Sequence, residues 1–103
     1  MATLKVVKTD QFLADLEDVV LFIARDNVLA AMDMEQHVHS QVDSLADPNF
    51  PRRIGRVPGT LELVVRPNYV VILQQTNTTV TAFSVLHVAR RGIQNLDRRG
   101  ATF

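Results

Sequence analysis

Hydrophobic residues recur at helical spacing in two neighbouring stretches of the first half of the chain. Thr9 or Asp10 can cap the first predicted helix, and a second runs from about Val28 to Leu45 after a break at Asp26-Asn27. Two amphipathic helices joined by so short a turn are expected to form an antiparallel hairpin. The two apolar stripes consist of Phe12, Leu16, Val19, Val20 and Ile23, and of Ala31, Met34, Val38, Val42 and Leu45.

The pattern changes to strands after Asp47-Pro48-Asn49-Phe50-Pro51, because neither proline can continue a helix. A short strand is also predicted at Thr3–Lys8, where apolar residues alternate with Lys5. The expected order is therefore β-α-α-β-β-β, an α+β fold with the helical hairpin packed on a small antiparallel sheet. The three later strands are predicted at Thr60–Arg66, Tyr69–Gln75 and Val80–Ala89, and the last of them is expected inside the sheet.

The length of 103 residues fits a single domain over residues 1–103, with residues 92–103 as a candidate flexible tail. There is no cysteine, which excludes disulfides, thiolate metal sites and cysteine nucleophiles. The longest apolar stretches are far shorter than a membrane span, and the N-terminus has no signal-peptide pattern. We therefore expect a cytoplasmic protein.

The formal net charge of zero conceals a segregation of charge along the chain. Residues 1–50 carry three basic and nine acidic residues, a net charge of −6, and residues 51–103 carry eight arginines and two acids, a net charge of +6. Either the two halves fold against each other, or the second half presents a basic face to an anionic partner. Arginine suits planar, bidentate contacts to phosphate or carboxylate. The arginines are Arg52, Arg53, Arg56, Arg66, Arg90, Arg91, Arg98 and Arg99.

Four local sequences, in this order and spacing, resemble the RelE/ParE toxin superfamily over roughly residues 3–95. They are the "P…GR" passage from Asp47-Pro48 to Gly55-Arg56-Val57, the "G-T-R-E-L"-like strand Gly59-Thr60-Leu61-Glu62-Leu63-Val64-Val65, the strand opening Pro67-Asn68-Tyr69-Val70-Val71-Ile72, and the closing strand Val85-Leu86-His87-Val88-Ala89-Arg90-Arg91. The resemblance implies the toxin of a type II toxin–antitoxin system. RelE-like members cleave mRNA on the ribosome, and ParE-like members poison DNA gyrase without nuclease activity of their own.

The candidate catalytic residues indicate which of these two branches the chain resembles more. Arg56 and Arg91 match positions at which RelE-like nucleases keep phosphate-stabilising arginines, and His87 is the best acid–base candidate because histidine titrates near neutrality. The tyrosine that the nuclease pattern expects beyond Arg91 is replaced by Asp97. The single tyrosine, Tyr69, opens a predicted strand, where a structural role is favoured.

The sequence therefore favours a ParE-like gyrase inhibitor, with a ribosome-dependent endoribonuclease using Arg56, His87 and Arg91 as the alternative. A member that binds its antitoxin without toxicity is a third hypothesis. The expected partners are a cognate antitoxin with an acidic segment and DNA gyrase, or the ribosome and mRNA in the alternative. No cofactor or metal is expected, since His37 and His39 point to nearly opposite sides of a helix. The predicted partner-binding residues are Arg52, Arg53, Arg56, Arg66, Arg90 and Arg91.

Overall fold

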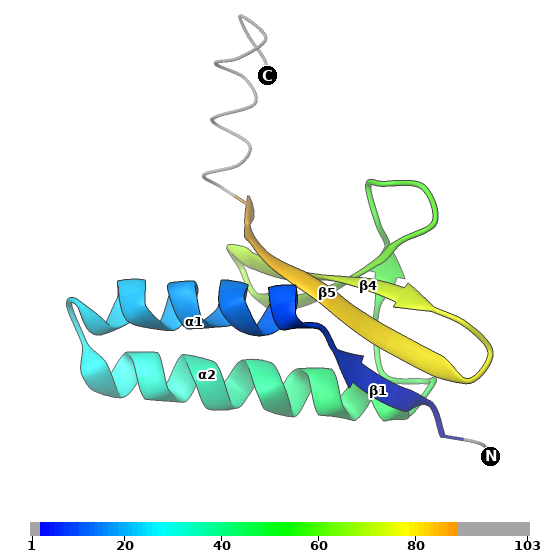
Figure 1. The fold of residues 1–103 in the computed structure, drawn as a ribbon, viewed down its shortest axis with the longest axis horizontal. Helices are drawn as coiled ribbons and strands as arrows, with labels where there is room; N and C mark the ends of the chain where they lie inside the picture. Colours follow the sequence, from blue (N-terminus) through cyan, green and yellow to red (C-terminus); the bar gives the residue numbers. More distant parts are fainter. Residues whose placement is uncertain (1–2, 89–103) are drawn as a thin grey trace, which may run out of the picture.

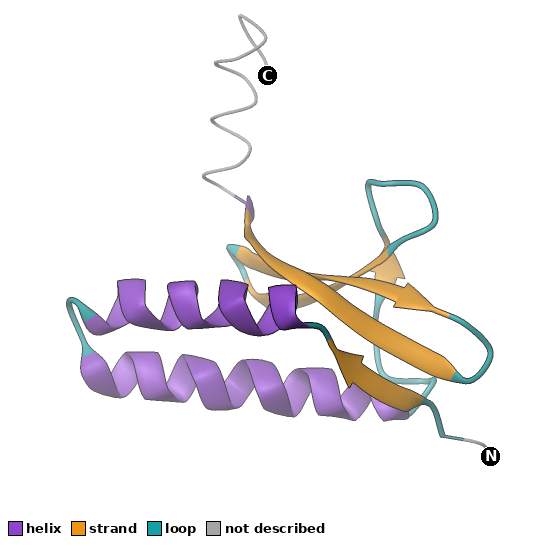
Figure 2. Ribbon diagram, in the orientation of Figure 1, coloured by secondary structure: helices purple, strands orange, loops and turns teal. Residues whose placement is uncertain are grey.

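The computed structural model describes residues 3–88 and shows a helical hairpin beside a twisted sheet (Figures 1 and 2). The predicted tail at 92–103 and the arginines Arg90, Arg91, Arg98 and Arg99 lie outside the described residues. The elements along the chain are β1 (Lys5–Lys8), α1 (Asp10–Ala24), α2 (Val28–Asp43), the 3₁₀ helix η1 (Ser44–Ala46), β2 (Arg53–Ile54), β3 (Leu61–Arg66), β4 (Tyr69–Gln75) and β5 (Thr79–His87).

Both helices begin at a capping side chain, as the sequence predicts for α1. The Thr9 hydroxyl accepts a hydrogen bond from the Phe12 amide at 3.0 Å, and the Asn27 side chain accepts one from the Ala30 amide at 3.0 Å. The three-residue connection between the helices, residues 25–27, allows them to run antiparallel side by side (Figure 1). The predicted hairpin is confirmed.

The sheet has five strands in the order β1-β5-β4-β3-β2, and it is mixed rather than wholly antiparallel. β3, β4 and β5 form the predicted antiparallel meander, but β1 pairs with β5 in parallel, from Lys5 opposite Thr79 to Lys8 opposite Ala82. Parallel neighbours need a long crossover connection, which the helices and the other strands provide here. The α+β fold is confirmed, with β5 inside the sheet and β1 in the opposite sense to that expected.

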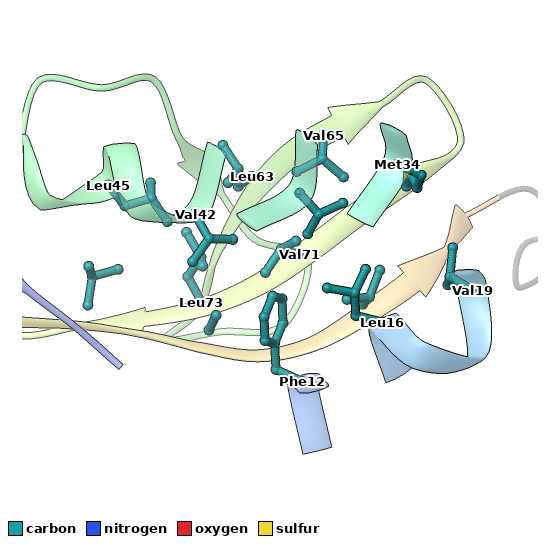
Figure 3. Close-up of a cluster of buried hydrophobic side chains, with 14 of the residues drawn as sticks. Phe12, Leu16, Val19, Met34, Val42, Leu45, Leu63, Val65, Val71 and Leu73 are labelled. Atoms are coloured by element: carbon teal, nitrogen blue, oxygen red, sulfur yellow. The ribbon is translucent and has the colours of Figure 1, made fainter. Parts of the chain in front are cut away.

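The core lies between the helices and one face of the sheet (Figure 3). Phe12 is fully buried at its centre, and the predicted stripes of both helices point into it. Alternate residues of β3, β4 and β5 complete the core, since successive side chains of a strand point to opposite faces. The buried residues around Phe12 include Leu16, Val19, Met34, Val38, Val42, Leu45, Leu63, Val65, Val71, Leu73, Val80, Ala82 and Val85.

The short strand β2 was not predicted, and it begins the loop that leads into β3. Arg53 and Ile54 pair with Glu62 and Leu61, so the chain between them folds back as an irregular hairpin. Two residues give no recognisable hydrophobic period, which is why the pattern did not reveal this strand. Beyond this contact, β3 has no strand neighbour on its outer side within residues 3–88.

None of the helices in the described part of the chain combines the length and the apolar character needed to cross a membrane.

Candidate functional site

Folding leaves the segregated charges largely apart. Within residues 3–88, one ion pair joins the acidic first half to the basic second half: Arg66 Nη2 lies 3.0 Å from Asp33 Oδ2, and both side chains remain substantially exposed. The pair between Lys8 and Asp43 stays within the first half. The interpretation that the two halves neutralise each other therefore has little support in these contacts, and the basic-face interpretation is favoured.

Arg52 is held within the fold by hydrogen bonds to three backbone carbonyl groups and one side chain. Its guanidinium donates to the carbonyl oxygens of Asp47 at 2.6 Å, Phe50 at 2.9 Å and Leu45 at 3.4 Å, and to Gln75 Oε1 at 2.9 Å. Burial lowers the pKa of Arg52, and the nearby Asp47 carboxylate partly offsets that effect. The planar guanidinium group thus links the end of η1, the following loop and β4. Most of its donors are unavailable to a partner.

Glu62 is the one charged side chain among the buried polar groups of the described chain, with 4% of its surface exposed. Its Oε1 accepts from Arg53 Nε at 3.1 Å and pairs with Arg53 Nη2 at 3.0 Å. Its Oε2 accepts from the backbone amide of Arg56 at 3.1 Å. Both carboxylate oxygens therefore hold the loop that carries Arg53 and Arg56, which makes Glu62 the anchor of this basic segment.

The pKa of Glu62 is lowered from its ordinary value of 4.5. Burial by itself would raise the pKa, but the hydrogen bonds from the Arg56 amide and the Arg53 side chain, with the charges of both arginines, outweigh it. Because the folded-state pKa lies below the unfolded one, this carboxylate stabilises the fold above pH 4.5 and loses that contribution as the pH falls through the folded-state pKa.

We accordingly expect Glu62→Gln to lower the free energy of unfolding at neutral pH by about 1–2 kcal/mol, because charge-assisted bonds are lost. Between neutral pH and acid, the free energy of unfolding of the variant should also fall less than that of the wild type. Urea titrations at a series of pH values measure both effects, with exposed Glu17→Gln as the matched control. An acid dependence identical in Glu62→Gln and wild type would contradict the anchoring role.

Arg56 differs from its arginine neighbours. Its guanidinium makes no hydrogen bond or ion pair with any residue in the range 3–88, and the residue is exposed. It lies at the rim of a hollow of about 340 Å³ with an aliphatic lining. The other lining residues are Val57, Glu62, Val70, Ile72, Leu86 and Val88.

His87 lies on the other face of the sheet. It stands opposite Tyr69 in the β4–β5 ladder, and the two rings meet edge to face with centroids 4.7 Å apart. Tyr69 packs against the core, which confirms that this is the helix-covered face. His87 lines a separate hollow of about 260 Å³ with residues of α1, among them Asp15 and Asp18. The structure thus brings Tyr69 and His87 together and separates both from Arg56, while Arg91 lies outside the described residues.

His37 and His39 bind different neighbours on two sides of α2. His37 Nε2 donates to the Val65 carbonyl oxygen of β3 at 2.7 Å, since a carbonyl can only accept. His39 Nδ1 accepts from Lys8 Nζ of β1 at 2.9 Å. The two rings are therefore occupied separately. Within residues 3–88, no three His, Cys, Asp or Glu side chains gather in a group that could hold a metal ion.

The sequence interpretation missed Glu62 as a functional residue. One signal was available: Glu62 interrupts the apolar run of β3, and it is one of only two acids in the basic half of the chain. A lone carboxylate in such a strand predicts a buried pairing with a nearby arginine. The sequence did not reveal which arginine, because Arg52, Arg53 and Arg56 lie within a few residues of one another.

Comparison with known proteins assigns this architecture. A model of the ParE toxin of the type II toxin–antitoxin system parDE matches residues 6–92, most of the chain. A chain from the chromosomal ParDE TA system of P. aeruginosa superposes with a TM-score of 0.72 at 17% identity, covering 84% of this chain and 97% of that one. A chain of the E. coli DinJ–YafQ complex gives a TM-score of 0.56 at 14% identity, with 84% and 96% covered. No curated protein matches the sequence.

The two solved structures share the fold at low sequence identity, and the family model covers the helical hairpin and all of the meander. The resemblance to the RelE/ParE superfamily, closer to its ParE-like members, is confirmed. The chain belongs to the ParE toxin family of type II toxin–antitoxin systems.

Proposed function

We propose that this toxin inhibits DNA gyrase and that a cognate antitoxin neutralises it. The observation that carries the proposal is the match to the ParE toxin model over residues 6–92. ParE-like toxins act without catalysis of their own, so the proposal requires a binding surface and no acid–base site. The arginines of the second half supply such a surface: among the described ones, Arg53 and Arg66 remain substantially exposed despite their ion pairs, and exposed Arg56 makes no ion pair.

The separation of Arg56 from His87 supports gyrase inhibition over mRNA cleavage. Cleavage by the 2′-hydroxyl needs an acid–base pair next to cations that stabilise the phosphorane-like transition state. Arg56 and His87 line different hollows on opposite faces of the sheet. The Tyr69 ring packs on His87 and the core, which favours a structural role for both rings.

An acidic segment of the antitoxin is the partner that suits the basic half of the chain. Arg53, Arg56 and Arg66 are presented by the β2–β3 region, and Arg53 and Arg66 keep exposed side chains despite their internal ion pairs. Charge-assisted contacts to carboxylates would then add to the attraction of the unpaired Arg56. We expect the segment to cover the span 52–66 and, beyond the described residues, the arginines at 90–99.

Pulse-labelling of cells in the minutes after induction tests the target. Thymidine and methionine incorporation are followed side by side, with co-expression of the antitoxin as the control that should restore both. A gyrase inhibitor is expected to reduce thymidine incorporation first while translation continues. If methionine incorporation collapses first, the target is the ribosome, and Arg56, His87 and Arg91 become the residues to substitute. Growth without any arrest would instead support a non-toxic member of the family.

A further inference from the structure

The face of the sheet opposite the helices carries the hollow beside Arg56. Val70 stands opposite Leu86 in the β4–β5 ladder, and Ile72 stands opposite Glu62 in the β3–β4 ladder. The intervening residue Val71 points into the core, so these side chains share the opposite face. Their aliphatic groups form the floor of a hollow of about 340 Å³, a size that admits one or two side chains of a partner.

The rim of this hollow is fixed by the chain between β2 and β3. The Glu62 carboxylate holds the Arg56 amide at 3.1 Å, and Gly55 donates its amide to the Thr60 carbonyl oxygen at 2.9 Å. A Cβ atom on Gly55 would collide with Thr60 Oγ1, and Gly59 adopts a positive φ of 85°. Arg56 and Val57 therefore sit in a loop of defined shape above the sheet.

The hollow combines an apolar floor with a single uncommitted cation. Glu62 also reaches it, but both of its oxygens are engaged by the loop, and its side chain is 5% exposed. The guanidinium of Arg56 makes no hydrogen bond or ion pair with the described residues, although its charge acts on nearby Glu62. A bound group that is both aliphatic and anionic could pack on the apolar floor and pair with the arginine at the rim.

We propose that this hollow binds an acidic peptide segment, with an aliphatic side chain on Val70, Ile72 and Leu86 and a neighbouring carboxylate on Arg56. The inference rests on the proposed antitoxin partner and adds the place and chemistry of one contact. A nucleotide fits less well: the lining has no aromatic ring for a base to stack on and no amide or hydroxyl side chain to read its edges.

The test is a titration of methyl-labelled full-length chain, followed by NMR. The probe is a capped tetrapeptide that alternates glutamate with leucine; the matched controls are the lysine–leucine analogue and oligouridylate. We expect the acidic peptide to shift the methyl signals of Val70, Ile72 and Leu86. The dissociation constant should be about 1 mM, because the peptide gains only one buried leucine side chain and one ion pair. The lysine analogue should leave these signals unchanged.

Two variants separate the site from general charge attraction. Arg56→Gln should weaken binding of the acidic peptide about fivefold, whereas Arg25→Gln, an exposed arginine at the hairpin turn, should leave it unchanged. The proposal is overturned if the acidic peptide shifts none of the three signals at about 10 mM, if the lysine analogue binds equally, or if only the oligonucleotide binds. The titration involves neither gyrase nor growth, so its failure is distinguishable from failure of the proposed toxicity.

Discussion

Phe12→Ala is expected to lower the free energy of unfolding by about 4 kcal/mol, the largest effect of any substitution considered for this chain. Phe12 is fully buried, and its ring meets the His39 ring edge to face, with centroids 6.1 Å apart. It lies where α1, α2 and the sheet converge (Figure 3). Truncation would leave a cavity that the rigid sheet cannot close, in a domain whose total stability is of the order of 10 kcal/mol.

The next residue in the chain provides the control. Leu13 is 43% exposed, so Leu13→Ala should change the free energy of unfolding by about 0.5 kcal/mol or less. Urea denaturation followed by circular dichroism compares the two variants under one set of conditions. Equal losses for Phe12→Ala and Leu13→Ala would show that the assigned face of α1 is not the one that packs on the sheet.

Arg52→Ala is expected to lower the free energy of unfolding by about 2–3 kcal/mol, because its carbonyl partners lose a shared cationic donor. Arg52→Lys should recover only part of this loss, since an ammonium group cannot span Asp47, Phe50 and Gln75 as the planar guanidinium does. Arg56→Ala is the matched control from the same basic segment, and we expect it to change stability by about 0.5 kcal/mol or less.

The measurement is again denaturation by urea, combined with binding to the antitoxin. Arg52→Ala should reduce stability far more than it reduces the affinity of the folded protein, whereas Arg56→Ala should do the reverse. If Arg52→Ala weakens binding and leaves the unfolding midpoint unchanged, then Arg52 faces the partner and its hydrogen bonds to the loop are dispensable.

Much of the fold could be predicted because its signals are local. The helical spacing of Phe12, Leu16 and Val19 marks a face of α1, and the cap at Thr9 indicates where this helix begins. The break at Asp26-Asn27 in the hydrophobic pattern indicates where α2 follows. The strand Tyr69–Gln75 was predicted with its observed bounds. The parallel sense of β1 could not be predicted in the same way, because it depends on pairing with β5 at the other end of the chain, which no local pattern encodes.

The candidate site was less predictable for a related reason. Arg52, Arg53 and Arg56 look alike in the sequence, but only the tertiary fold directs Arg52 to backbone carbonyls, Arg53 to Glu62 and Arg56 to an open hollow. Arg56 entered the nuclease hypothesis because it matches a family position, and His87 entered it as the best acid–base candidate in the sequence. The alternation of β5 places His87 on the helix-covered face, so a shared site with Arg56 depended on a strand register that the sequence did not reveal.

Inhibition of gyrase by this chain can be measured without cells, in a supercoiling reaction with purified components. Relaxed plasmid, gyrase and ATP are incubated with increasing amounts of the full-length chain, with heat-denatured chain as the unfolded control. We expect supercoiling to fall as the folded chain is added, the denatured chain to have little effect, and the antitoxin to restore activity. Gyrase that supercoils at its full rate in a large excess of the folded chain would show that this toxin does not act by inhibiting gyrase.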